Sequence, residues 1–143
     1  TTTNHFEGPL AHDPRDEEVR NKTSTLPRRM RGDELIAALP SRPSALTMIG
    51  MLRDRRGVGN TPLALGDRRA IDALIATHSV VFDVTERAAW VSEAPHVLGR
   101  FVRFDLRKLL ADGYLPEGDG GDGDGTLPAD PLLLEGTYDL RRL

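Results

Sequence analysis

The chain has 143 residues, the size of one ordinary domain. Its 19 Lys and Arg against 22 Asp and Glu give a net charge of −3, which argues against a nucleic-acid binder, because such a protein shows a clustered basic excess. The absence of cysteine excludes disulfides, thiolate metal sites and a cysteine nucleophile within this chain, and no apolar run reaches the roughly 18–20 residues of a membrane span.

The first third of the sequence is polar and interrupted. Two prolines and a glycine exclude a long helix over residues 7–14, and the charge run at 15–22 is expected to be a solvated surface segment. Apolar residues at helical spacing predict a short amphipathic helix over 33–39, with Asp33 as its N-cap and Pro40 as its stop.

The next segment, residues 45–52, carries apolar residues on one helical face, with Ser44 in position to cap it. Residues 53–69 are rich in glycine and arginine and predict a loop. This loop contains Gly57-Val58-Gly59, but without a third glycine the pattern does not indicate a dinucleotide site.

The clearest pattern in the sequence is a series of strands. The β-forming residues 80–82 and the segment 88–93 flank a turn-like stretch at 83–87, which predicts a hairpin. Residues 101–106 predict a third strand, and 107–111 a helical turn.

Glycine and aspartate dominate the segment 114–126, which is predicted to be flexible. An EF-hand loop starting at Asp122 or Asp124 is excluded, because neither register places an acidic or amide side chain at position 5 or glycine at position 6. The tail 127–143 carries three consecutive leucines and is expected to dock on the body or on a partner chain.

The histidines His5, His12, His78 and His96 show no metal-ligand spacing. We therefore expect no metal site and no cofactor.

Three arginines, Arg28, Arg29 and Arg31, form a basic cluster in the sequence. A guanidinium binds a substrate carboxylate in a bidentate manner, so substrate binding is one interpretation of the cluster. The simpler interpretation, a solvated helix face, is the one we favour at this level.

The sequence begins Thr1-Thr2-Thr3-Asn4-His5-Phe6. An N-terminal threonine can act as a nucleophile whose own α-amine, with a pKa near 8, takes the proton from the hydroxyl. The amine is covalently fixed beside Oγ, so no separate histidine is needed. Because the sequence starts with threonine and not with an initiator methionine, we expect the chain to be either a fragment or the product of a specific cut before Thr1.

The TNHF segment, Thr3 to Phe6, resembles a segment of the linear-amide hydrolase and acyltransferase group of N-terminal nucleophile proteins, which includes the isopenicillin N acyltransferase-like (C45-type) proteins. Residues 77–92 are similar to the C-terminal strand pair of that family: a Thr, a hydrophobic strand ending in Asp, a turn, and a strand with Trp-Val-Ser. Ala94-Pro95 and residues 101–106 continue the similarity, which covers roughly residues 1–110.

The resemblance implies an α+β protein with a four-layered αββα fold, two sheets between helices, of which residues 1–113 form part of the catalytic domain. It implies an amidohydrolase or acyltransferase that acts on a small amide or acyl substrate through an acyl-enzyme. Thr1 and Asn4 are the expected catalytic residues, with the Asn4 side chain near the oxyanion hole. His5 and Phe6 are assigned to substrate binding.

The sequence departs from the family in one respect. Most relatives carry a cysteine nucleophile far upstream of the TNHF segment, whereas here that segment follows directly on Thr1. Either Thr1 is the nucleophile of a processed subunit, or the chain is a non-catalytic C-terminal part whose nucleophile lies on another chain. Both predict a companion chain from the same precursor, because 143 residues is short for a four-layered fold and a hydrophobic content of 38% is lean.

Overall fold

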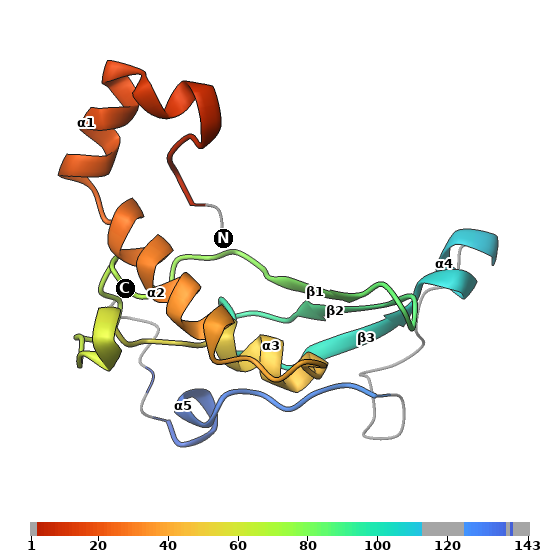
Figure 1. Ribbon diagram of the computed structural model, residues 1–143. Coiled ribbons are helices and arrows are strands. Elements are labelled where there is room, and N and C mark those ends of the chain that lie inside the picture. Colours follow the sequence, from red (N-terminus) through yellow and green to blue (C-terminus); the bar gives the residue numbers. More distant parts are fainter. Residues whose placement is uncertain (1–2, 113–124, 137, 139–143) are drawn as a thin grey trace. The chain divides into compact units, whose positions relative to one another are not determined.

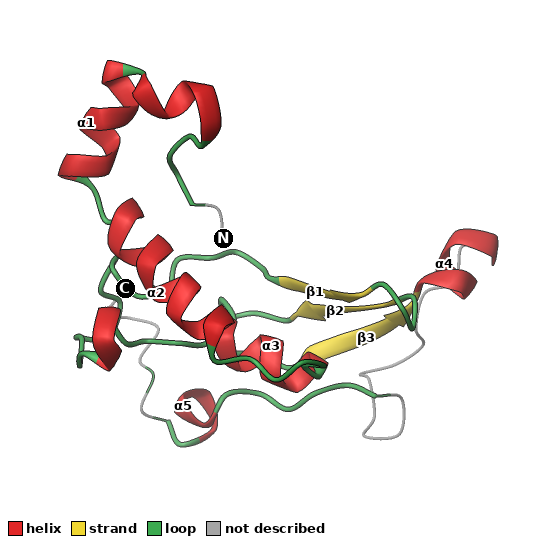
Figure 2. Cartoon of the chain, viewed as in Figure 1, coloured by secondary structure: helices red, strands yellow, loops and turns green. Residues whose placement is uncertain are grey.

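The computed structural model describes residues 3–112, 125–136 and 138 (Figure 1). It combines helices with an antiparallel three-stranded sheet, which confirms the α+β class (Figure 2). Thr1 and most of the predicted flexible segment 114–126 lie outside the described residues. No helix in the described part of the chain is long and apolar enough to cross a membrane.

The chain divides into two compact units. The first, here called the N-terminal unit, consists of Thr1–Pro43 and Asp54–Leu74. The second, here called the sheet unit, consists of Ser44–Arg53 and Ile75–Leu143.

The N-terminal unit is built on helices. The 3-10 helix η1 (Gly8–His12) leads into α1 (Pro14–Lys22), and a second 3-10 turn, η2 (Val58–Asn60), packs on α2 (Thr25–Ala37). The charge run was expected only as a solvated segment, but it forms α1. Its N-terminus is capped by Asp13, whose carboxylate accepts from the Arg15 amide at 2.8 Å.

Helix α2 starts well before Asp33, so the predicted start of this helix was wrong. The first two turns carry only two large apolar residues, Leu26 and Met30, and both are exposed, so hydrophobic spacing gives little signal there. Pro27 fits because a proline in the first turn of a helix removes no intrahelical hydrogen bond. Asp33 is not a cap; its carboxylate accepts from Arg29 Nε at 2.8 Å, one turn earlier on the same helix.

The sheet unit begins with α3 (Ala45–Leu52), and the predicted cap is confirmed, since Ser44 Oγ accepts from the Thr47 amide at 3.1 Å. The predicted hairpin and third strand are also confirmed. Their order in the antiparallel sheet is β1-β2-β3, and two short helices complete the described elements. The bounds are β1 (Val80–Asp83), β2 (Ala88–Ser92), β3 (Phe101–Asp105), α4 (Leu106–Asp112) and α5 (Pro131–Leu134).

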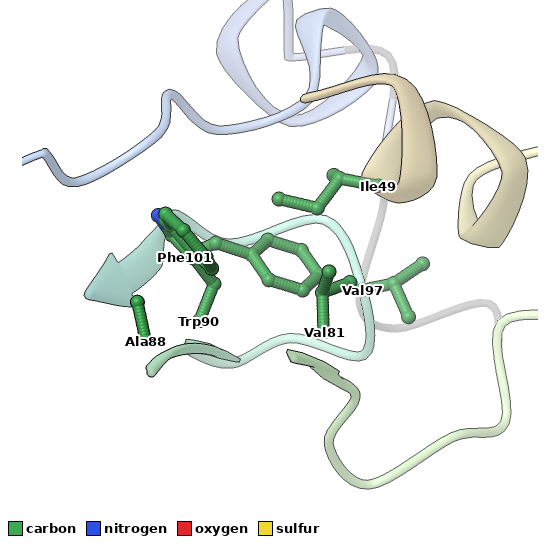
Figure 3. Close-up of a cluster of buried hydrophobic side chains, with 6 residues drawn as sticks. All are labelled: Ile49, Val81, Ala88, Trp90, Val97 and Phe101. Carbon is green, nitrogen blue, oxygen red and sulfur yellow. The ribbon is translucent and has the colours of Figure 1, made fainter. Parts of the chain in front are cut away.

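One face of the sheet forms the core of this unit (Figure 3). Val81 on β1, Trp90 on β2 and Phe101 on β3 meet Ile49, the fully buried residue of α3. The tail adds to this packing, because Phe101 and Leu127 exchange backbone hydrogen bonds of 3.0 and 2.9 Å.

The other face of the sheet is entirely apolar. Paired residues lie on the same face, so the register places two rows of side chains here. Phe82 is 64% exposed and Val80 36% exposed. We call this surface the open sheet face; its residues are Val80, Phe82, Ala89, Val91, Val102 and Phe104.

Candidate functional site

The TNHF segment is held by the hydroxyl of Thr25, at the start of α2. Thr25 is fully buried, and its Oγ1 accepts a hydrogen bond from the Asn4 amide at 2.9 Å. The same oxygen lies 2.8 Å from Thr3 Oγ1 and 3.0 Å from His5 Nδ1. One buried side chain therefore holds three consecutive residues of the TNHF segment.

A second anchor holds the next residue. Asp16 on α1 is 4% exposed, and its carboxylate accepts from the Phe6 amide at 2.8 Å and from Arg20 Nε at 2.7 Å. Burial alone would raise the pKa of Asp16, but the Phe6 amide and the Arg20 guanidinium together hold it below its ordinary value. Arg20 also donates to the carbonyl of Phe6, so both backbone groups of this residue are engaged.

The side chain of Asn4 has a defined orientation. Arg28 Nη2 donates to Asn4 Oδ1, and because a guanidinium can only donate, the amide must turn its oxygen towards it. The two Nδ2 hydrogens consequently point away from Arg28, and within the described ranges no acceptor occupies them. Asn4 is exposed, so these hydrogens are available to a ligand.

His5 is held from both sides. Its side chain is only 3% exposed, its Nδ1 lies 2.9 Å from Thr3 Oγ1, and its Nε2 lies 3.2 Å from the Glu7 carboxylate. Glu7 in turn accepts from Arg29. Both ring nitrogens are occupied, so the ring braces the segment instead of presenting a free nitrogen.

The segment borders a groove of about 490 Å³ in the N-terminal unit. Three residues predicted for the site, Asn4, His5 and Phe6, line it together, and the Phe6 side chain is 55% exposed. The lining is completed by Thr3, Arg15, Asp16 and Val19.

Sequence reasoning missed the two anchors, Thr25 and Asp16. The spacing of Asp16 and Arg20 is that of an i,i+4 ion pair, which could have predicted α1. Nothing in the sequence links Thr25 to a segment more than 20 residues earlier.

The three arginines of the sequence cluster have different partners. Arg31 is buried, which contradicts the expected solvated face, and it donates to both oxygens of Asp54 at 3.0 and 2.7 Å. Arg29 is paired with Asp33 and Glu7. Arg28 reaches only the neutral amide of Asn4 within the described residues.

In the ranges that the structure describes, no group of three or more His, Asp or Glu side chains is placed to hold a metal ion. Comparison of the chain with family models, with curated proteins and with solved structures finds no match.

Proposed function

We propose that this chain is one subunit of an N-terminal nucleophile amidohydrolase or acyltransferase, and that Asn4 supplies a hydrogen-bond donor to the oxyanion. The observation that carries the proposal is the double fixing of Asn4. Thr25 holds its backbone amide, and Arg28 holds its side-chain oxygen.

This fixing matters for catalysis because an oxyanion hole works through donors that are oriented before the reaction. Such donors stabilise the developing charge without a reorganisation cost at the moment of reaction. The Asn4 Nδ2 group meets this requirement, since its direction is set by Arg28 and its surroundings form the wall of an open groove.

In this proposal Thr1 is the nucleophile. Thr1 precedes Asn4 by three residues, and three residues of fully extended chain span at most about 10–11 Å. Thr1 Oγ attacks the amide carbonyl and its α-amine takes the proton, which then passes to the leaving amine as the C–N bond breaks. Water releases the acyl group in a hydrolase, and an acceptor amine takes it in a transferase.

The open sheet face supports the layered fold and the companion chain. An antiparallel sheet with one face in water alternates apolar and polar residues. Here the face that packs on α3 forms the core, and the side chains on the opposite face are all apolar. A second sheet, packed about 10 Å away, would bury them. This arrangement is that of the inner layers of an αββα sandwich.

Substitution of Asn4 by aspartate tests the oxyanion role. The carboxylate of Asn4→Asp can still accept from Arg28, so the segment stays in place, but the N–H donors are lost. We expect kcat to fall by at least about 10²–10³-fold with little change in folding. Asn21→Asp, the same change at an exposed position of α1, is the matched control and should retain activity. An Asn4→Asp enzyme with wild-type kcat would refute the proposal.

The identity of the nucleophile is tested on a precursor that extends upstream of Thr1. Cleavage before Thr1 that stops in Thr1→Ala, together with covalent labelling of Thr1 by an acylating β-lactone, supports Thr1. Label on another chain, with Thr1→Ala fully active, would instead support the second candidate, a chain that completes the fold around a nucleophile elsewhere. The open sheet face is the observation that favours this alternative.

A further inference from the structure

We propose that Arg28 binds a carboxylate of the substrate, so that the enzyme acts on amides of the N-acyl amino acid class. This inference rests on the proposed function of the same site. It follows from the difference between Arg28 and the two other arginines on α2.

Arg29 and Arg31 are neutralised by carboxylates of this chain. Arg29 contacts Asp33 and Glu7, and Arg31 contacts Asp54 and Glu34. Such pairing is the rule for guanidinium groups that are removed from water.

Arg28 has no such partner among the described residues. Its one hydrogen bond goes to the neutral oxygen of Asn4, and its Nε is buried without an acceptor. Burial, followed by the nearby positive charge of Arg68, lowers the pKa of Arg28. A partly buried cation beside a second cation is stabilised by an incoming anion.

The geometry of the neighbouring arginine indicates which anion fits. Arg31 presents Nε and Nη2 to the two oxygens of Asp54. Arg28 cannot present the same pair of donors, because its Nε is buried; its Nη2 donates to Asn4 Oδ1, and its Nη1 has no acceptor among the described residues. A carboxylate supplies the oxygen and the single negative charge that this guanidinium lacks.

The position of Arg28 also restricts where the carboxylate lies in the substrate. Arg28 contacts Asn4 directly, and Asn4 is the proposed donor to the reacting carbonyl oxygen. The anion and the scissile amide are therefore a few bonds apart. An amino acid whose nitrogen is acylated has this arrangement.

A matched pair of ligands tests the inference in the full chain. Hexanoylglycine and hexanoylglycinamide differ only in carrying a carboxylate or a neutral amide, and their affinities are measured by titration calorimetry. We expect the carboxylate to bind at least ten-fold more tightly. Arg28→Gln should abolish this preference, and Arg28→Lys should retain part of it. Arg42→Gln, which removes an exposed charge of the same unit, should leave the preference intact.

Circular dichroism of each variant separates loss of binding from loss of folding. Equal affinity for the two ligands, binding of neither, or a preserved preference in folded Arg28→Gln would overturn the inference. Titration needs no turnover, so the two proposals fail separately. An active enzyme with equal kcat/KM for both ligands would refute only the carboxylate site, whereas an inactive chain that still prefers hexanoylglycine would refute only the proposed catalysis.

Discussion

The buried hydroxyl of Thr25 makes a sharp prediction, because it can be removed with almost no change of volume. In Thr25→Val a methyl group replaces Oγ1, so no cavity forms. The Asn4 amide loses its acceptor, and the Thr3 hydroxyl and His5 Nδ1 lose a neighbour 2.8 and 3.0 Å away. The effect of the substitution therefore measures the hydrogen bonds themselves.

The size of this effect follows from the number of hydrogen bonds lost. A typical intramolecular hydrogen bond contributes about 0.5–1.5 kcal/mol. The substitution removes the contacts of Thr25 Oγ1 with three residues, while His5 Nδ1 keeps the Thr3 hydroxyl as a neighbour at 2.9 Å. We therefore expect Thr25→Val to lower the free energy of local opening of the TNHF segment by about 2–3 kcal/mol. In kinetic terms it should lower kcat through displacement of Asn4.

Hydrogen exchange of the Asn4 amide is the direct assay, with urea unfolding followed by far-UV circular dichroism for the whole unit. A change of 2–3 kcal/mol corresponds to roughly 30- to 150-fold faster exchange through local opening. Thr25→Ser is the control, because it keeps the hydroxyl and removes only a methyl group, worth about 1 kcal/mol. If Thr25→Val exchanges no faster than Thr25→Ser, the hydroxyl does not organise the site.

Three further predictions concern other parts of the chain. A Cβ on Gly99 would lie 2.3 Å from the carbonyl oxygen of Glu93, so Gly99→Ala should destabilise the sheet unit by about 1–3 kcal/mol in urea unfolding. Gly50 in α3 has open space around its Cβ position, so Gly50→Ala should stabilise the same unit by about 0.5–1 kcal/mol. The pKa of Asp16 is lowered in the folded state, so the carboxylate stabilises the folded chain fully above the unfolded pKa of about 4, and this stabilisation is lost as pH falls through the lowered pKa. Asp16→Asn should therefore reduce the fall of the free energy of unfolding at acid pH. An unchanged pH dependence would show that Asp16 does not have this role. Phe82→Glu on the open sheet face should leave the stability of the isolated chain within about 0.5 kcal/mol but prevent co-purification with the companion chain; unimpaired assembly would show that this face is not the contact.

The strands were predictable because their signals are local. Val80, Val81 and Phe82 are strong β-formers, and the polar turn after Asp83 closes the hairpin. Ser44 was predictable as a cap for the same reason, since its partner is three residues away. The sequence did not indicate that every side chain on the open sheet face is apolar until the register was known.

The helices of the N-terminal unit were less predictable because ion pairs, not hydrophobic periodicity, stabilise them. Helix α1 has no apolar stripe, and its surface is linked by pairs such as Lys22 with Glu18 at 2.9 Å. The first turns of α2 carry Thr25 and Arg28, which hydrogen-bond with Asn4, while their large apolar residues, Leu26 and Met30, are exposed. A method that looks for apolar spacing starts this helix too late.

The candidate site also contains residues that the sequence could indicate and one that it could not. Asn4, His5 and Phe6 could be selected from the sequence because they are contiguous. Thr25 could not, because its side chain acts on a segment 21 residues earlier through contacts that exist only in the folded chain. The sequence could group the residues proposed to carry the chemistry, but only the fold shows that Thr25 holds them in place.

The arginine cluster shows why a charge pattern in a sequence does not define a binding site. Successive residues of an α-helix point about 100° apart, so Arg28, Arg29 and Arg31 cannot all face one ligand. Their carboxylate partners lie partly on α2 itself, at Asp33 and Glu34, and partly on other segments, at Glu7 and Asp54. The sequence shows three equal charges, whereas in the described residues the fold pairs Arg29 and Arg31 with carboxylates and Arg28 only with Asn4. The proposed anion site therefore depends on which arginine the folded chain leaves without a carboxylate partner, and that could not be inferred from the charge pattern alone.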